Sequence, residues 1–238
     1  MWIAAHPDDE AVVAPLLAKW CIDDHARCSF LVLTRGEAGD CLLPNGCHPD
    51  LATVRSAEAA AATQYFHADS ILLTLPNESA FGLPDWRESS SGRPDVVAQV
   101  AALIEAVHPA LILTFDPRHG TTCHAEHMET GAIALEAVER LSFTPDVYLL
   151  ETRLSFTSEP FGIGFDRADV AAQRFDANQM LPFTGRAAWE EVTSDMDRHP
   201  SQFNAEWIAA VAATPASDRA VYIERASVAL GRAVFACQ

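Results

Sequence analysis

Residues 2–10, which read WIAAHPDDE, set the pattern that decides the fold. Residues 2–5 are short and apolar, so they predict a buried strand, and the polar residues after them predict a turn at its carboxyl end. A helix is expected to follow over residues 10–23. Pro15 should bend or restart this helix because proline lacks a backbone N–H and clashes with the preceding turn. The stretch therefore predicts a strand, a polar turn and a helix in succession.

The same alternation continues along the chain. Each further strand is expected to be apolar along its length and to be followed by a polar loop and a helix. Continuous apolar strands that alternate with helices indicate a parallel sheet covered on both faces. We therefore expect the α/β class, with a Rossmann-like, mostly parallel sheet. The expected strands are residues 29–34, 70–75, 110–115 and 147–152, and the expected helices are residues 51–66, 94–107 and 124–141.

The strand-and-helix pattern weakens in the last third of the chain. We expect a single domain over residues 1–238, with a regular core at residues 1–152 and a less regular part at residues 153–238. A strand pair is expected at residues 156–165. The expected helices of this part are residues 169–180, 187–196 and 204–213.

The charge balance restricts the partners of the protein. Sixteen Lys and Arg against 33 Asp and Glu give a formal net charge of -17. Such a surface repels nucleic-acid phosphates and anionic lipids, so we expect neither a nucleic acid nor a membrane as a partner. We also expect no signal peptide, since the first residues lack a basic segment. A neutral or cationic substrate fits this charge better than a polyanion does, and a homo-oligomer is left open.

The cysteines bear on the cellular setting. None of the six belongs to a C-x-x-C pair, and their scatter is not typical of a disulfide framework. A reduced, cytoplasmic setting is therefore expected. A bridge between Cys41 and Cys47, which share one loop, is the minor alternative. The cysteines are Cys21, Cys28, Cys41, Cys47, Cys123 and Cys237.

The first candidate site is the polar run directly after the first strand. In such sheets ligands bind beyond the carboxyl ends of the strands. His6 and Asp9 are spaced so that both can face one point, and imidazole and carboxylate are suitable zinc ligands. Asp8 and Glu10 belong to the same run. The alternative is a helix start with acidic residues near its positive end, but a histidine at the end of a strand favours a metal site.

The second candidate site follows the fourth strand. His124 and His127 are three residues apart at a helix start, so they share a face, where one can bind a metal and the other the substrate. Glu126 can orient a histidine through its second ring nitrogen. His119 and Cys123 precede them. The alternative is a polar helix cap with incidental histidines. Cys123 could be a soft metal ligand, but a single thiol beside histidines is more often only a neighbour. The motif is not H-E-x-x-H, so a helix-borne metalloprotease site is not supported.

Together these motifs resemble the LmbE-like, or PIG-L, family of zinc-dependent de-N-acetylases. Residues 5–10 read AHPDDE, the first motif of the family. Residues 33–39 resemble its T-x-G-E-x-G loop, residues 55–58 its R-x-x-E helix, and residues 124–127 its H-P-D-H motif. Beyond this point the resemblance is limited to residues 199–203, which resemble an H-x-S-Q-F ending.

The resemblance implies a role for each matching residue. The zinc ligands of the family fall on His6, Asp9 and His127, its general base on Asp8, and the histidine that steadies the oxyanion on His124. It also implies Zn²⁺, with another divalent metal as an alternative, and an open position for water on the ion. Substrate-binding or supporting roles fall on Arg55, Glu37, Glu126 and Glu10.

The resemblance also implies the reaction, which is hydrolysis of an acyl amide in a small-molecule or glycoconjugate substrate, with acetyl as the acyl group and an amino-sugar as the amine. One alternative is a hydrolase of a different acyl amide or of an ester on the same metal site. Another is a catalytically inactive homologue that binds metal or sugar. A nucleotide-binding role is disfavoured, because no G-x-G-x-x-G motif follows the first strand. The sequence leaves the exact substrate open.

Overall fold

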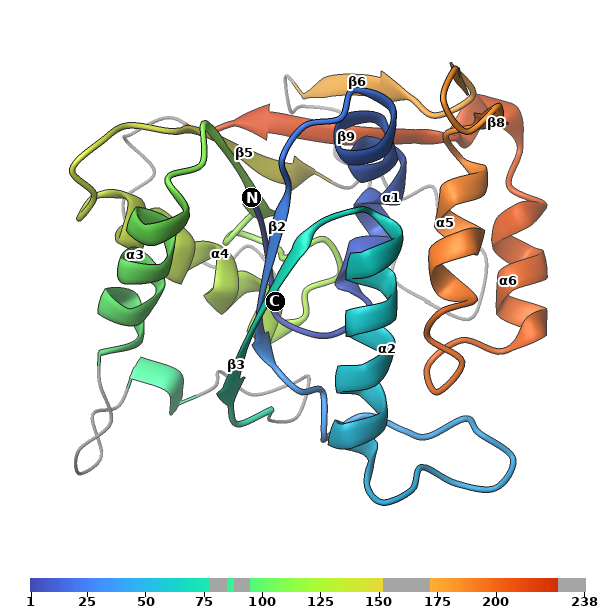
Figure 1. The fold of residues 1–238 in the computed structure, drawn as a ribbon, viewed down its shortest axis with the longest axis horizontal. Helices are drawn as coiled ribbons and strands as arrows, with labels where there is room; N and C mark the ends of the chain where they lie inside the picture. The colour runs from blue at the N-terminus through green and yellow to red at the C-terminus, as the bar shows by residue number, and fades with distance from the viewer. Residues whose placement is uncertain (78–84, 88–94, 152–171, 227–238) are drawn as a thin grey trace. The chain divides into compact units, whose positions relative to one another are not determined.

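The computed structural model describes residues 1–77, 85–87, 95–151 and 172–226 (Figure 1). Within these ranges, no helix has the length and apolar character needed to cross a bilayer. The chain divides into two compact units, each with its own strands and helices. The first unit is Met1–Ala5, Glu78–Gln173 and Tyr222–Gln238, and the second unit is His6–Asn77 and Arg174–Val221.

The first unit is built on parallel strands. β1 (Trp2–Ala4) pairs with β4 (Leu111–Phe115), and β4 pairs with β5 (Asp146–Glu151), both in parallel. β9 (Ala220–Arg225) runs antiparallel to β5. This arrangement places the ends of β1, β4 and β5 at one edge, so the loop after β4 starts where ligands bind in parallel sheets.

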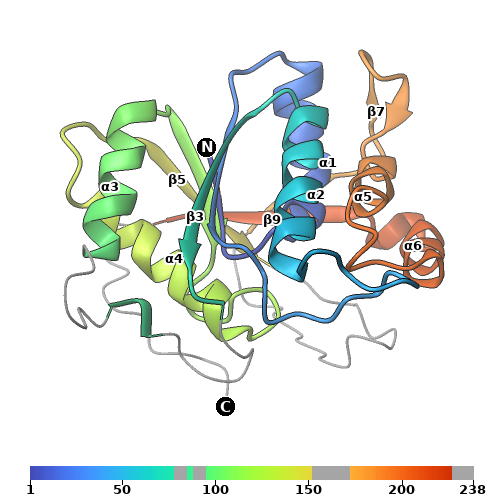
Figure 2. The same ribbon diagram turned by 60° about the horizontal axis from the view of Figure 1, so that its bottom comes forward.

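Two helices of the first unit pack on each other and on its strands. α3 (Val96–Val107) begins where Asp95 accepts hydrogen bonds from the backbone N–H groups of two residues in the first turn. α4 (Ala125–Val138) lies beside α3 (Figure 2) and also contacts β4 and β1. It approaches β4 closely at Gly131, where an added Cβ would lie 2.2 Å from the backbone oxygen at the end of that strand. A glycine is therefore required at this contact.

The second unit begins with a helical segment of changing pitch. It runs through η1 (Asp9–Val13), a 3₁₀ helix, α1 (Ala14–Leu17), and η2 (Ala18–Asp23), a π-helix. Pro15 occupies the first turn of α1, so the predicted restart of the helix is confirmed. Proline is tolerated there because a first-turn residue has no intrahelical acceptor for an N–H.

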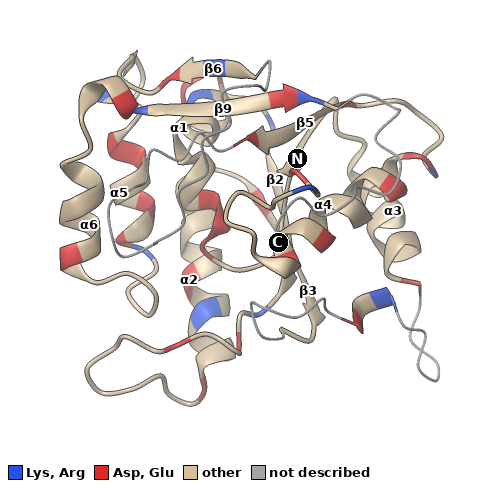
Figure 3. Ribbon diagram, turned by 180° about the vertical axis from the view of Figure 1, so that it is seen from behind, with Lys and Arg blue, Asp and Glu red and all other residues tan. Residues whose placement is uncertain are grey.

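The rest of the second unit combines a parallel strand pair with helices. β2 (Ser29–Thr34) pairs in parallel with β3 (Asp69–Leu75). The connection between these strands contains α2 (Leu51–Tyr65), an alanine-rich helix that is capped by Asp50. The acidic excess of the chain is visible on α5 (Glu190–Met196), a helix that has three acidic residues and no Lys or Arg (Figure 3). The remaining elements of this unit are β6 (Gln173–Asp176), β7 (Met180–Leu181), β8 (Arg186–Ala187), α5 (Glu190–Met196), α6 (Ala205–Ala212) and η4 (Ala216–Asp218), whereas η3 (Asp85–Arg87) belongs to the first unit.

The predicted α/β class with mostly parallel strands is confirmed, and each predicted strand up to residue 151 lies within one residue of an observed one. One prediction differs from the structure, and one observed strand was not predicted. The helix expected over residues 169–180 is wrong for the described residues, because the Asp176 side chain accepts the backbone N–H of Asn178 and closes a turn between β6 and β7. β9 was not anticipated. The strand pair expected at residues 156–165 lies outside the described residues, and the single domain stays a prediction.

The expectation of unpaired cysteines is wrong. Cys21 and Cys28 form a disulfide, with Cα atoms 5.7 Å apart. Cys41 and Cys47, the pair named as the minor alternative, form a second one with Cα atoms 6.0 Å apart. Cys123 is also disulfide-bonded. Pairing requires two Cα atoms within about 7 Å, and the fold sets this distance, so spacing in the sequence did not reveal it.

Candidate metal centre and active site

The two predicted ligands near the start of the chain lie side by side. The backbone N–H of His6 donates to Asp9 Oδ2 over 2.8 Å, and His6 Nδ1 lies 3.6 Å from Asp9 Oδ1. Both side chains are buried. The turn between them contains Asp8 with a φ of 118°, a conformation that L-residues rarely adopt. The HPDDE turn therefore brings an imidazole and a carboxylate together and directs Asp8 elsewhere.

Asp8 is held by Arg55 from α2. Arg55 Nη2 lies 2.7 Å from Asp8 Oδ1 and donates to the Pro7 carbonyl over 2.6 Å, while Nη1 donates to the Gly36 carbonyl over 2.9 Å. Burial raises the pKa of the Asp8 carboxyl, and the positive charge of Arg55 opposes this rise. Gly36 is needed beside this guanidinium, since a Cβ there would lie 2.3 Å from it. The structure thus places the predicted base and Arg55 together.

Glu10 and Glu37 occupy different positions. Glu10 is buried, and its Oε2 accepts the Asp8 backbone N–H over 3.2 Å. Glu37 is exposed, and its Oε1 accepts the backbone N–H of Asn77 over 3.2 Å. Glu10 therefore belongs to the HPDDE turn, whereas Glu37 ties its own loop to the residues after β3.

His199 was missed as a site residue. Its Nε2 lies 2.8 Å from Glu10 Oε1, and both side chains are buried. Burial lowers the pKa of His199, but the charge of Glu10 and this hydrogen bond outweigh it and raise the pKa to about 9. The signal that could have found it is the HPSQF segment at residues 199–203.

The histidines of the first unit are positioned by their Nδ1 atoms. His124 caps α4, and its Nδ1 accepts the backbone N–H of Glu126 over 3.3 Å. His127 Nδ1 lies 2.9 Å from the Gly120 carbonyl. Because a carbonyl only accepts, His127 carries its proton on Nδ1 and presents a lone pair on Nε2. In neutral His124 the proton is instead on Nε2. The Nε2 atom of His127 can therefore act as an acceptor or a ligand, and the Nε2–H of His124 can act as a donor.

Ring stacking fixes these two side chains further. His127 stacks on Phe115 at the end of β4, with ring centroids 4.1 Å apart, and His124 lies 4.6 Å from His127 by the same measure. The predicted common face is therefore confirmed. Glu126 is fully buried, and its contact with His124 runs through its backbone N–H.

A buried charge cluster supports the loop between β4 and α4. Arg118 binds Asp116 and also lies 3.1 Å from Glu151 and 2.8 Å from Glu224. His119 Nδ1 accepts the Thr121 backbone N–H, so its Nε2 carries the proton and donates to Glu151 over 3.2 Å. His119 therefore steadies the loop. Arg118 supplies a cation among these carboxylates.

The charges of this cluster shift two carboxyl groups in opposite directions. Burial and the neighbouring Asp116 raise the pKa of Glu151 to about 7. Burial also favours a neutral Asp116, but hydrogen bonds from Arg118 and Glu151 outweigh it and lower the pKa of Asp116 to about 2. Near neutral pH Asp116 is therefore charged, whereas Glu151 exchanges its proton.

The donor set suits a zinc ion. Within the second unit, His6 and Asp9 offer an imidazole nitrogen and a carboxylate oxygen. Within the first unit, His127 offers Nε2. Imidazole and carboxylate are the ligand types of catalytic zinc. The bond from His127 Nδ1 to a backbone carbonyl is the usual support of a metal-binding histidine. The chemistry of these residues therefore fits the metal that the motifs imply.

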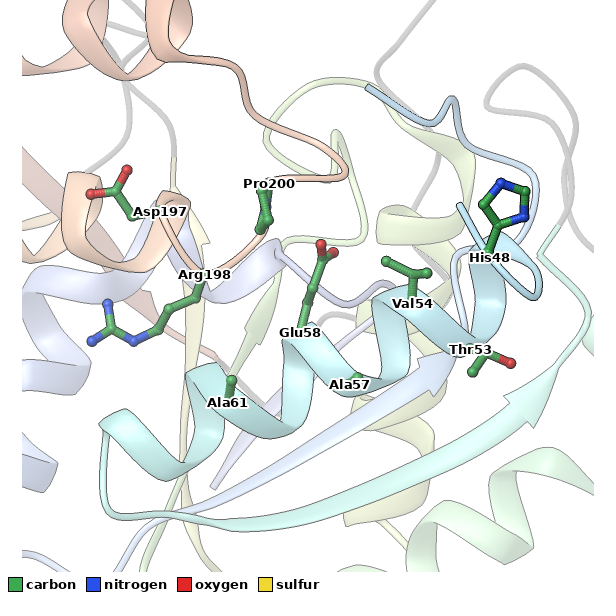
Figure 4. A pocket seen from close by; sticks show the side chains of 9 residues that line it. All are labelled: His48, Thr53, Val54, Ala57, Glu58, Ala61, Asp197, Arg198 and Pro200. Carbon is green, nitrogen blue, oxygen red and sulfur yellow. The ribbon is translucent and has the colours of Figure 1, made fainter. Parts of the chain in front are cut away.

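A separate hollow lies on the second unit. It has a volume of about 480 Å³ and runs along one side of α2 (Figure 4). None of the predicted ligands or bases is among its lining residues, so it is distinct from the predicted catalytic groups. These residues are His48, Thr53, Val54, Ala57, Glu58, Ala61, Asp197, Arg198 and Pro200.

The fold is that of an α/β protein, with candidate metal-binding histidines and carboxylates in the loops that follow its parallel strands. Residues 1–138 match the family described as PIG-L: GlcNAc-PI de-N-acetylase. Because this match covers more than half of the chain, the chain belongs to that family.

Curated relatives carry one name, 1D-myo-inositol 2-acetamido-2-deoxy-alpha-D-glucopyranoside deacetylase. The protein from Kineococcus radiotolerans is 26% identical over 159 residues, which are 58% of this chain and 44% of the relative. The protein from Mycolicibacterium smegmatis is 26% identical over 227 residues, which are 76% of this chain and 75% of the relative. The chain thus spans less than half of the Kineococcus protein.

Solved structures share the fold at low sequence identity. N,N'-diacetylchitobiose deacetylase from Pyrococcus horikoshii has a TM-score of 0.65 and 15% identity, over 96% of this chain and 84% of that one. The 4-carboxy-2-hydroxymuconate hydratase from Pseudomonas putida has a TM-score of 0.63 and 16% identity, over 95% of both chains. Since a hydratase shares the architecture, the fold alone does not decide the reaction.

Proposed function

We propose that the chain is a zinc-dependent de-N-acetylase that removes the acetyl group from the amine of an amino-sugar-containing substrate. The observation that carries this proposal is the HPDDE turn, where His6 and Asp9 lie together while Asp8 faces Arg55. Membership of the PIG-L family and the deacetylase names of the curated relatives support it.

In this proposal His6, Asp9 and His127 hold the zinc ion. When bound, the ion lowers the pKa of a water molecule and polarises the acyl carbonyl. Asp8 accepts the proton of the attacking water, and its raised pKa suits a carboxylate that must take up a proton. Arg55 keeps the carboxylate in place through its contacts with Asp8 and the Pro7 carbonyl.

His124 supplies the second function of the site. Its Nε2–H donates to the oxygen on which negative charge develops, because its Nδ1 is occupied by the Glu126 backbone N–H. The proton that the leaving amine needs comes from His124 or from protonated Asp8. The products are a carboxylate and a free amine. Roles for Glu37 and Glu126 in substrate binding stay predictions.

The substrate is proposed to be a neutral glycoside or glycoconjugate. The net charge of -17 disfavours polyanions, and the relatives are named for an N-acetylglucosamine derivative of inositol. Formation of a homo-oligomer stays a prediction.

The expected cytoplasmic setting is no longer supported by the cysteines. That expectation assumed unpaired cysteines, whereas the structure has disulfides, which persist mainly in oxidising compartments.

The test is amine release from a panel of N-acetylated sugars and glycosides, measured with and without a chelator. The proposal expects release from at least one substrate, loss with chelator and recovery with added zinc. Asp8→Asn should lower the rate of release strongly and keep the metal, while Asp40→Asn, at an exposed carboxylate, should behave as wild type. Acyl analogues separate an acetyl-specific enzyme from a hydrolase of other amides or esters. Absence of release from every substrate refutes the deacetylase and favours an inactive homologue.

A further inference from the structure

A buried link connects the C-terminal part of the second unit to the HPDDE turn. His199 follows α5, and Glu10 lies in η1, 189 positions earlier. His199 is 0% exposed and Glu10 is 2% exposed. Burying two such polar groups is costly unless they satisfy one another, so their contact is a built feature of the unit.

Glu10 uses both of its oxygens in this link. Oε1 lies 2.8 Å from His199 Nε2, and Oε2 accepts the Asp8 backbone N–H over 3.2 Å. His199 Nδ1 has no hydrogen-bond partner among the described residues. A carboxylate only accepts, so the donor must be Nε2–H of His199. The chain of bonds therefore runs from His199 through Glu10 to the backbone of Asp8.

The end of this chain of bonds is the strained position of the turn. Asp8 has a φ of 118°, which side-chain-bearing residues rarely adopt. Such a conformation persists only when the surrounding contacts enforce it. Glu10 holds the Asp8 backbone, and Arg55 holds the Asp8 carboxylate. Two independent contacts thus direct the predicted base.

A cation site is the competing interpretation of this cluster. Asp195 is fully buried beside His199 and Glu10, and both of its carboxylate oxygens lack a hydrogen-bond partner among the described residues. Two ligands of one tetrahedral zinc ion lie about 3.3 Å apart, because each metal bond is about 2.0–2.1 Å long. The separation of 2.8 Å between His199 Nε2 and Glu10 Oε1 is that of a hydrogen bond, so the geometry favours a proton between them.

We propose that His199 is a positioning residue that acts through Glu10 to hold Asp8 in its catalytic orientation. Its effect on turnover rests on the proposed deacetylase function. Its effect on the Asp8 backbone does not. His199 touches neither Asp8 nor the substrate in this proposal, and its contribution is the direction in which the Asp8 carboxylate points.

The same segment offers a matched control. Two residues after His199, Ser201 donates to Glu58 of α2 from both its backbone N–H, over 3.0 Å, and its hydroxyl, over 2.5 Å. Ser201 is also fully buried. Ser201→Ala therefore removes a buried hydrogen bond from the same segment without touching Glu10.

The activity test compares His199→Leu, His199→Gln and Ser201→Ala in the zinc-loaded enzyme. Leucine removes the donor, so kcat should fall at least about tenfold, with KM and zinc content close to wild type. Glutamine presents an N–H at a similar reach and should restore most of kcat. Ser201→Ala should lower Tm but keep kcat. A kcat loss in His199→Leu no larger than in Ser201→Ala, or no rescue by glutamine, overturns the proposal.

The second test needs no substrate. Hydrogen exchange of a peptide spanning residues 6–11 should show faster exchange of the Asp8 amide in His199→Leu than in wild type or Ser201→Ala. If His199→Leu does not fold, Glu10→Gln takes its place. This variant has one side-chain oxygen in place of the two acceptors Oε1 and Oε2, so the Asp8 amide should again exchange faster. Unchanged exchange in both overturns the proposal, as does a second metal equivalent in wild type that His199→Leu lacks. If wild type releases no amine, the deacetylase fails, and exchange still decides this inference.

Discussion

Replacing Glu151 by glutamine tests the electrostatics beneath the loop that leads to His124 and His127. The pKa of Glu151 is about 7 in the folded protein, above its ordinary value of 4.5, because the group is buried beside Asp116. A carboxyl with a raised folded pKa binds its proton more tightly in the folded chain than in the unfolded one. The free energy of unfolding therefore falls as the pH rises from 4.5 through about 7.

The size of the effect follows from the two pKa values. At about 1.4 kcal/mol per pKa unit, ionisation of Glu151 lowers the free energy of unfolding of wild type by about 3 kcal/mol once the pH is above 7. Glutamine resembles the protonated group and cannot ionise, so Glu151→Gln should be more stable than wild type by about this amount at pH 8. At pH 5 the gain should be below about 1 kcal/mol. For a chain of this length, the gain at pH 8 raises Tm by about 6–12 °C.

The assay is urea unfolding, or calorimetry, of both proteins between pH 5 and pH 8. This window avoids Asp116, whose pKa of about 2 lies well below it. Glu224→Gln is the control, because Glu224 faces the same Arg118 guanidinium from a more exposed position. A stability difference between Glu151→Gln and wild type that does not grow with pH would refute the reasoning.

Three further predictions follow from the site and the cysteines. Asp8→Asn should lower kcat by about 10²–10⁴-fold with zinc retained, because the base is lost and the ligands are not; amine release and metal analysis measure this. Arg55→Met should cost about 3–5 kcal/mol of unfolding free energy in urea, since it leaves Asp8 buried without its cation. Alkylation without reductant should leave the disulfide-bonded cysteines unmodified, and peptide mapping measures this. These cysteines are Cys21, Cys28, Cys41, Cys47 and Cys123.

Each of these has a contradicting outcome. Near-normal turnover of Asp8→Asn would remove Asp8 as the base. An Arg55→Met variant within about 1 kcal/mol of wild type would show that Asp8 is adequately solvated without Arg55. Alkylation of Cys21 or Cys41 in unreduced protein would restore the original expectation of free thiols.

Much of the fold was predictable because it depends on local pattern. Apolar runs at β2 (Ser29–Thr34) and β4 (Leu111–Phe115) mark strands without knowledge of their neighbours. The alanine-rich α2 (Leu51–Tyr65) begins where Asp50 caps it. β9 (Ala220–Arg225) was not predicted, because this strand lies in the irregular part of the chain and is recognised only by its antiparallel pairing with β5.

The site divides in the same way. The sequence by itself determined which reactive side chains lie close together. His6 and Asp9, like His124 and His127, are close in sequence, and a single turn brings each pair together. Their catalytic roles stay predictions. Only the tertiary structure decided what holds them. Asp8 meets Arg55 from α2, and Glu10 meets His199 from 189 positions away.

The cysteines illustrate the physical reason. Their spacing says nothing about which Cα atoms approach within bonding distance, and that distance is a property of the packed chain. The same holds for the burial that raises the pKa of Asp8 and Glu151. Short-range pattern specifies residue types and local turns, whereas long-range contacts and burial exist only after folding, and these set the charge and direction of the reactive groups.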